Sequence, residues 1–178
     1  MKQSNYSKVL DVFFDNPTER FHIREVGRIT GLNPNTVLNV VKGLVKEGLV
    51  IREKKKHIVE LSTNVDEGFR ELKIVRNLER IYRSGLIKFL NKYFKNPKAI
   101  VLFGSVRKGE DMAGSDIDIA IEDDNFEKYE IKRLDEMKKF EKELGKEIQL
   151  HLFNKKKIDV NVFNNILNGI VLSGFLEV

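Results

Sequence analysis

The sequence contains no cysteine, and it has no long hydrophobic run. Without cysteine the chain can form neither disulfides nor cysteine-ligated zinc sites, which suits a reducing compartment. No apolar stretch is long enough to cross a bilayer, and residues 1–7 are too polar to resemble a signal peptide. These absences predict a cytoplasmic protein with no membrane partner.

A short apolar run that ends in a glycine is the first part of the most informative pattern. Residues 99–103 are brief and apolar enough to form a buried strand, and Gly104 then permits a tight turn. Ser105 would open a short helix, whose first backbone N–H groups could bind phosphate oxygens. Lys108 could add a positive charge.

Two carboxylates follow at alternate positions. In residues 116–121 polar and apolar side chains alternate, so Asp116 and Asp118 should project from one face of a strand while Ile117, Ile119 and Ile121 pack on the other. Two carboxylates on one face repel each other unless a hard divalent cation binds them, here Mg²⁺ or Mn²⁺. The pattern therefore favours phosphoryl or nucleotidyl transfer.

The two segments together resemble a known family. Gly104-Ser-Val-Arg-Lys-Gly109 and Ser115-Asp-Ile-Asp118 are similar to the G-S and D-x-D motifs of the DNA polymerase β-type nucleotidyltransferase superfamily, particularly its minimal members. Arg107 departs from the small residue usual there. The resemblance implies a nucleotidyltransferase fold, with an NTP, expected to be ATP, held by Gly104, Ser105, Lys108 and Ser115. It also implies metal binding and catalysis by Asp116 and Asp118. Taken separately, a helix-capping serine and a solvated acidic strand end are the ordinary alternatives.

The third carboxylate that this family usually has is not evident. In the strand expected at 146–153, Glu147, Gln149 and His151 share one face, and Gln149 occupies the matching position. An amide cannot accept a proton at neutral pH, so a base would have to be Glu147, His151 or the substrate itself. Glu147 is our candidate. A solvated glutamate and a structural histidine are the alternative interpretations.

Residues 1–64 show a second pattern, predicted as three helices followed by a hairpin. A first helix ends before Pro17, a second spans 23–30, and a third begins at Asn33-Pro34 and ends near Gly48. Inward positions on the third helix are Val37, Val41, Leu44 and Val45. Asn35, Asn39, Lys42 and Lys46 line its outer face. Strands at 49–52 and 58–62 should flank a basic turn, 53–57, containing Lys54, Lys55 and Lys56.

This order resembles winged helix-turn-helix domains, in which the second helix of the pair enters the major groove. The net charge of +5 also suits a polyanionic partner. The resemblance implies DNA binding by the outer face of the third helix and by the basic turn, and a homodimer on a palindromic site. Winged helices also mediate protein contacts, which stays an alternative.

The predicted fold class is α+β, with a winged helix-turn-helix at 1–64, a linking helical segment at 65–96 and a nucleotidyltransferase domain with a small mixed sheet at 97–178. Ser84-Gly85 is expected to kink or split the linking helix, and residues 126–144 read as one amphipathic helix. Three functions fit this organisation. They are an NMP-transferring enzyme, a DNA-binding regulator with a catalytically weak nucleotide-sensing domain, and an antitoxin for a HEPN-type toxin, because minimal nucleotidyltransferases are often paired with such toxins.

Overall fold

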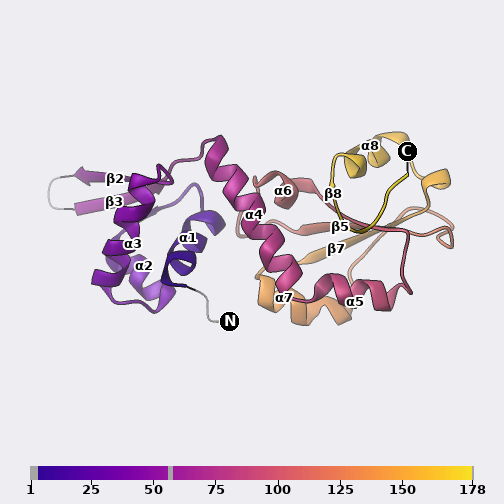
Figure 1. The fold of residues 1–178 in the computed structure, drawn as a ribbon, viewed down its shortest axis with the longest axis horizontal. Helices are drawn as coiled ribbons and strands as arrows, with labels where there is room; N and C mark the ends of the chain where they lie inside the picture. Colours follow the sequence, from indigo (N-terminus) through magenta and orange to yellow (C-terminus); the bar gives the residue numbers. More distant parts are fainter. Residues whose placement is uncertain (1–3, 56–57, 178) are drawn as a thin grey trace. The chain divides into compact units, whose positions relative to one another are not determined.

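The computed structural model describes residues 4–55 and 58–177, an α+β structure with two separate sheets (Figure 1). Internal contacts divide the chain into two compact units, Met1–Glu71 and Leu72–Val178. The domain limits drawn from the sequence, at 64/65 and 96/97, stay predictions. Among the residues just given, no helix has the length and apolar character needed to span a bilayer.

The first unit holds three helices and a three-stranded antiparallel sheet. Its elements are α1 (Asn5–Asp15), β1 (Arg20–Phe21), α2 (Ile23–Thr30), α3 (Pro34–Lys46), β2 (Val50–Lys55) and β3 (Ile58–Thr63), with strand order β1-β3-β2. The Asn33 side chain accepts a hydrogen bond from the Thr36 backbone N–H, and Pro34 occupies the first turn of α3. Both features set the start of α3 where the sequence predicts it. Val9, Phe13, Val37, Val41 and Leu44 are fully buried in the core of this unit.

Two predictions in this unit are wrong. Val45 is exposed, because it lies beside the buried row Val37, Val41 and Leu44 on α3 instead of within it. The basic turn is also shorter than predicted. β2 continues to Lys55 because its backbone pairs with β3, Lys54 opposite Val59 and Lys55 opposite Ile58. Polar residues on a solvated strand give no alternating signal, so the sequence pattern stops too early. The side chain of Lys55 and all of Lys56 lie outside the described part of the chain.

The second unit is a five-stranded mixed sheet with helices on both faces. Its elements are α4 (Glu67–Arg83), which begins in the first unit, α5 (Leu86–Tyr93), β4 (Ala99–Phe103), α6 (Gly104–Lys108), β5 (Ile117–Glu122), β6 (Glu130–Lys132), η1 (Asp135–Met137), α7 (Lys138–Leu144), β7 (Ile148–Phe153), η2 (Lys155–Lys157), α8 (Val160–Leu167) and β8 (Ile170–Gly174). The strand order is β6-β7-β5-β4-β8, in which only β5 and β7 run parallel.

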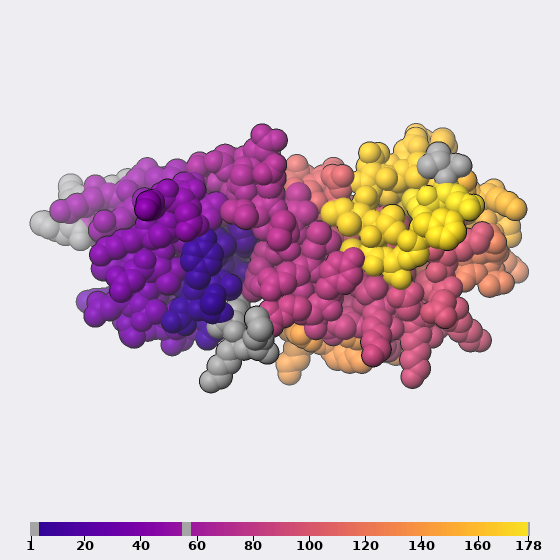
Figure 2. All heavy atoms as spheres, in the orientation of Figure 1, coloured from indigo at the N-terminus to yellow at the C-terminus, as the bar shows by residue number. Residues whose placement is uncertain are grey.

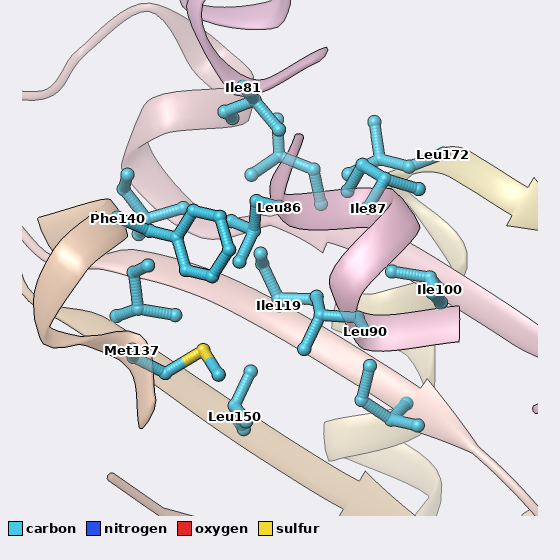
Figure 3. Close-up of a cluster of buried hydrophobic side chains, with 14 of the residues drawn as sticks. Ile81, Leu86, Ile87, Leu90, Ile100, Ile119, Met137, Phe140, Leu150 and Leu172 are labelled. Carbon is cyan, nitrogen blue, oxygen red and sulfur yellow. The ribbon is translucent and has the colours of Figure 1, made fainter. Parts of the chain in front are cut away.

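The apolar residues of this unit fall into two layers. Leu86 and Leu90 of α5, Met137 of η1 and Phe140 of α7 pack with Ile119 and the other isoleucines of β5 on one face of the sheet (Figure 3). Ile166 of α8 packs on the opposite face, with Val101, Ala120 and Phe153. Figure 1 shows the same arrangement, with α5 and α7 on one side of the strands and α8 on the other. The alternation in β5 thus places Ile119 and Asp118 on opposite faces, as the sequence predicts.

The segment between β5 and β7 corrects another prediction. Residues 126–144 do not form one helix, because Glu130–Lys132 pairs antiparallel with β7 as the edge strand β6, and the α-helix begins only at Lys138. The backbone of β7 would otherwise lack partners along that edge. Leu134, Met137 and Leu144 still pack against the core, whereas Ile131 is exposed. The linking segment does split at Ser84-Gly85, where Gly85 has a φ of 76°.

Candidate active site

The turn at Gly104 and the carboxylate of Asp118 meet at one end of the sheet. Phe103, the last residue of β4, lies opposite Asp118 on β5, and Gly104 follows with a φ of 74°. A side chain at position 104 would overlap a carboxylate oxygen of Asp118. Glycine is therefore required both for the left-handed conformation and for the close approach of backbone to carboxylate.

Asp116 and Asp118 are both partly open to solvent, with side chains 27% and 24% exposed. Asp118 lies in β5, and Asp116 comes immediately before the strand begins. The alternation of the strand places both carboxylates on the face opposite the isoleucines. Both carboxylates therefore lie where a ligand could reach them.

A glutamine occupies the position at which the family's third carboxylate was expected. Gln149 on β7 lies opposite Asp118 in the parallel pairing of β5 with β7. Its side-chain amide donates a hydrogen bond to Oδ2 of Asp116. The amide thus supplies a donor where a carboxylate would add negative charge, so the described site has one negative charge fewer than that pattern implies.

Arg133 is a member of this site that the sequence analysis missed. Its guanidinium donates to Oδ2 of Asp116 at 3.0 Å and forms an ion pair with Glu147. Arg133 directly follows the edge strand β6, so it could not be placed here while residues 126–144 were read as one helix. Glu147 itself is exposed, and this ion pair connects it to Asp116.

His151 and Tyr129 form a second polar contact on the same face. The histidine Nε2 lies 3.4 Å from Oδ1 of Asp118, and its Nδ1 lies 2.7 Å from the Tyr129 hydroxyl. The ring packs edge-on against Phe103. Burial raises the pKa of the Tyr129 hydroxyl, and the nearby charge of Asp118 adds to the shift. Tyr129 therefore stays protonated near neutral pH and can donate to the histidine.

Two hollows flank the carboxylates. One, of about 540 Å³, is lined by Phe103, Gly104, Arg107, Lys108, Asn165 and Asn168. The other, of about 450 Å³, includes Ser115, Asp116, Lys146 and Glu147 in its lining. Of the predicted nucleotide ligands, Gly104 and Lys108 thus line the first hollow and Ser115 the second. Ser105 lines neither, and the Ser115 hydroxyl accepts a hydrogen bond from the Met112 N–H within its own loop.

Arg107, Asn165 and Asn168 line the first hollow without having been predicted. Within the described chain, Nε of Arg107 is a buried donor with no hydrogen-bond partner. A buried donor without a partner is costly. The residue that departs from the family pattern also places a positive charge beside this hollow.

The loop between α6 and β5 is anchored by a buried ionic cluster. Asp111 is fully buried and lies 3.4 Å from the ammonium of Lys73 and 3.1 Å from that of Lys146, while Asn77 donates to it at 2.9 Å. Breaking such a pair costs several kcal/mol, on the order of 3–5, because a charge is left buried and unpaired. The cluster therefore fixes the loop that leads into Ser115 and Asp116.

The chemistry of the donors fits a hard divalent cation. Mg²⁺ in phosphoryl-transfer sites is typically bound by one or two carboxylates together with substrate phosphates and water. Asp116 and Asp118 provide two such carboxylates. Across residues 4–55 and 58–177 there is no group of three or more histidine, aspartate or glutamate side chains that could hold a metal by itself.

The predicted DNA-binding residues belong to the other unit. Asn35, Asn39, Lys42 and Lys46 are all exposed on α3, and Lys54 is exposed on β2. The four α3 residues therefore lie outside the buried row of that helix. Exposure alone does not distinguish a DNA-binding face from a solvated one.

Comparison with known proteins bears on the second unit. A family model described as a nucleotidyltransferase domain matches residues 83–172, which is half of the chain. The match extends from the end of α4 into β8 and includes the turn at Gly104, both aspartates and the β7 strand. No curated protein and no solved structure matches the chain.

Proposed function

The chain belongs to the nucleotidyltransferase domain family, and from this premise we propose that it transfers a nucleoside monophosphate from an NTP to a protein or small-molecule acceptor. ATP is the expected donor and Mg²⁺ or Mn²⁺ the expected metal. The family supports NMP transfer in general, whereas the donor, the acceptor and the residue roles below belong to the proposal.

The observation that carries the proposal is the contact between Gly104 and Asp118. The turn lacks a side chain at the one position where a side chain would overlap the carboxylate. Triphosphate oxygens and a carboxylate-bound cation have to lie within a few ångströms of each other for phosphoryl transfer. A glycine turn packed directly on a carboxylate allows that approach.

In this proposal each residue has a role. The triphosphate is bound through backbone N–H groups, hydroxyls or positive charge, by Gly104, Ser105, Ser115, Lys108 and Arg107. Asp116 and Asp118 hold the metal. A divalent cation bound by them would neutralise the charge that develops on the phosphoryl oxygens.

The acceptor must lose a proton, and Glu147 is the proposed base. In the structure its carboxylate is paired with Arg133, so the guanidinium occupies the group that would have to accept the proton. Proton transfer to Glu147 thus requires Arg133 to turn away, for instance toward the phosphates. His151 beside Asp118 and the substrate itself are the other groups able to take the proton.

The test compares two glycines that both have a positive φ but differ in their surroundings. Gly104→Ala should abolish nucleotide binding, whereas Gly48→Ala should leave it intact, since nothing lies within 4 Å of a side chain at position 48 and Gly48 belongs to the first unit. The double variant Asp116→Asn/Asp118→Asn should abolish only the metal-dependent part of nucleotide binding. Calorimetric titration of each NTP with and without Mg²⁺ measures both effects, and labelled NTP then detects the acceptor. Unchanged binding by Gly104→Ala would contradict the proposal.

Gln149 favours a second candidate, a DNA-binding regulator or antitoxin whose nucleotidyltransferase domain binds nucleotide but transfers it weakly. An amide hydrogen-bonded to Asp116 can neither take a proton nor add metal affinity comparable to a carboxylate. The first unit would then be a winged helix-turn-helix. Asn35, Asn39, Lys42 and Lys46 of α3 would contact DNA as part of a homodimer, and Lys54, Lys55 and Lys56 would form the wing. A HEPN-type toxin is the partner proposed for the antitoxin role. Nucleotide binding without transfer of label to any acceptor would favour this candidate.

A further inference from the structure

The second unit contains a stretch of sequence in which every charged residue is positive. Between Glu79 and Glu110 there is no aspartate or glutamate, whereas arginines and lysines recur throughout. The stretch includes the end of α4, all of α5 and β4. Opposite charges are interspersed over most of the rest of the chain, so this segment differs from an ordinary solvated surface.

Three of the eight positively charged residues in this stretch line one groove. A hollow of about 840 Å³ is bordered by Tyr82, Gly85, Ile87, Asn91, Asn96 and Ser173, together with Lys88, Lys92 and Lys95. It shares no lining residue with the hollows beside Gly104 and Asp116. Figure 2 shows the segment around α5 at the molecular surface, with side chains that extend into solvent. The groove is therefore a second concave surface, separate from the candidate active site.

The three lysines form a row along α5. Lys88 and Lys92 are one turn apart, about 6 Å along the helix axis, and Lys95 continues the row just beyond the end of α5. Within the described residues none of the three pairs with a carboxylate, whereas Lys98 pairs with Asp124 and Lys132 with Glu130. Three neighbouring cations without counter-ions attract a polyanion whose charges repeat along a chain.

Aromatic side chains accompany the row. Tyr82 is 51% exposed at the groove, and its hydroxyl is fixed by a hydrogen bond to the Leu172 carbonyl at 3.2 Å. Tyr93 follows Lys92 on α5 outside the lining of the groove, is 42% exposed and stacks on Phe89. Exposed rings held in place by such contacts offer flat surfaces on which bases can stack.

The backbone at the end of the groove is strained. Lys95 and Asn96 have φ values of 55° and 61°, in the left-handed region that non-glycine residues rarely adopt. They follow Phe94, the C-cap of α5, and Lys95 occupies the position after the cap at which glycine is usual. Lysine in this conformation costs roughly 1 kcal/mol or more, and such strain is concentrated at functional sites.

From these observations we infer that the groove binds a single-stranded polynucleotide. The lysines would contact successive phosphates and Tyr82 would stack on a base. A concave groove accepts one strand, whereas the grooves of a duplex accept protruding elements such as helices. This inference does not depend on nucleotide transfer or on DNA binding by α3.

The experiment measures anisotropy of fluorescein-labelled oligo(U) and oligo(dT) of about 12 nucleotides, and of a duplex of equal length, on the full chain. Lys88→Gln/Lys92→Gln/Lys95→Gln should weaken single-strand binding at least about tenfold at low salt. It should also reduce the slope of log K against log salt by about 2, because three phosphate contacts are lost. Comparing oligo(U) with oligo(dT) shows whether RNA or DNA is the preferred strand.

A matched control separates the groove from net charge. Lys128→Gln/Lys132→Gln/Lys138→Gln removes the same charge at lysines that each lie beside a carboxylate, and should change binding little. Tyr82→Ala should weaken binding several-fold without changing the salt slope, whereas Tyr82→Phe, which keeps the ring, should not. Three outcomes would overturn the inference, namely no binding by wild type at low salt, equal losses in both triple variants, or a groove variant that loses duplex binding more than single-strand binding.

Discussion

At the residue scale, the electrostatics of the candidate active site depend on Arg133. Oδ2 of Asp116 accepts hydrogen bonds from Arg133 and from the Gln149 amide, and the same guanidinium pairs with Glu147. A cation that binds Oδ2 of Asp116 must compete with these donors, because they occupy lone pairs of that oxygen. If the carboxylates bind a metal as proposed, we expect Arg133 to lower their affinity for it and, once displaced, to be able to bind phosphate.

We predict that Arg133→Gln raises the affinity for Mn²⁺ in the absence of nucleotide by about tenfold, which corresponds to roughly 1.4 kcal/mol. The gain arises because Asp116 and Glu147 lose their competing positive charge. Calorimetric titration with MnCl₂ measures it. Global stability should change by less than about 1 kcal/mol, since Arg133 is exposed.

Lys132→Gln is the matched control for this variant. It removes the same charge one residue away, at a lysine that pairs with Glu130 instead of Asp116. Its Mn²⁺ affinity should stay near that of wild type. Equal gains in both variants would mean that net charge is responsible, and a weaker affinity in Arg133→Gln would mean that the arginine orders the carboxylates for the metal.

At the element scale, β5 carries polar groups at both of its ends. Asp118 lies near its start in the candidate site, and Glu122 ends the strand with only 4% of its surface exposed. Burial raises the pKa of the Glu122 carboxyl, and the nearby Lys98 charge only partly opposes this. The neutral form is thus favoured in the folded state. Protonated Glu122 therefore contributes to the stability of the fold below the ordinary glutamate pKa, and this contribution is lost as the pH rises through the raised pKa.

Glu122→Gln should remove this loss of stability at high pH. We expect the variant to be more stable than wild type at pH 7, by about 1 kcal/mol, and the difference to shrink toward pH 4. Urea unfolding at the two pH values measures it, with Glu143→Gln, an exposed position on α7, as the control. A variant less stable than wild type at pH 7 would show that the attraction of Lys98 outweighs burial.

The elements also show how far sequence reasoning reaches. β4, the turn at Gly104, the alternation of β5 and the start of α3 at Asn33-Pro34 could all be predicted, because each depends on local residue types. β6 could not be, because residues 130–132 form a strand only by pairing with β7. The same error hid Arg133, and the contact of Tyr129 with His151 likewise depends on a fold that brings distant residues together. Predictions fail here where a partner across the sheet decides the structure.

At the scale of the whole molecule, the chain consists of two units with separate cores. The core of the first unit contains Phe13, Val41 and Phe69, and shares no residue with the cores formed around Ile119 and Phe153 in the second. The candidate active site and the single-strand groove both belong to the second unit, whereas the proposed DNA-binding face of α3 belongs to the first. Functions that depend on different units should therefore be lost independently.

We predict such a separation from two double variants. Lys42→Gln/Lys46→Gln should weaken duplex DNA binding about tenfold and reduce its salt slope by about 2, because two phosphate contacts are lost, while leaving metal-dependent nucleotide binding unchanged. Asp116→Asn/Asp118→Asn should abolish metal-dependent nucleotide binding and leave duplex DNA binding unchanged. Anisotropy on labelled duplex and calorimetry with NTP measure the two losses, and Lys132→Gln/Lys138→Gln controls for net charge. If each double variant impaired both activities, nucleotide and DNA binding would be coupled. The nucleotidyltransferase domain would then act as a sensor for the first unit, because linkage requires the effect to be reciprocal.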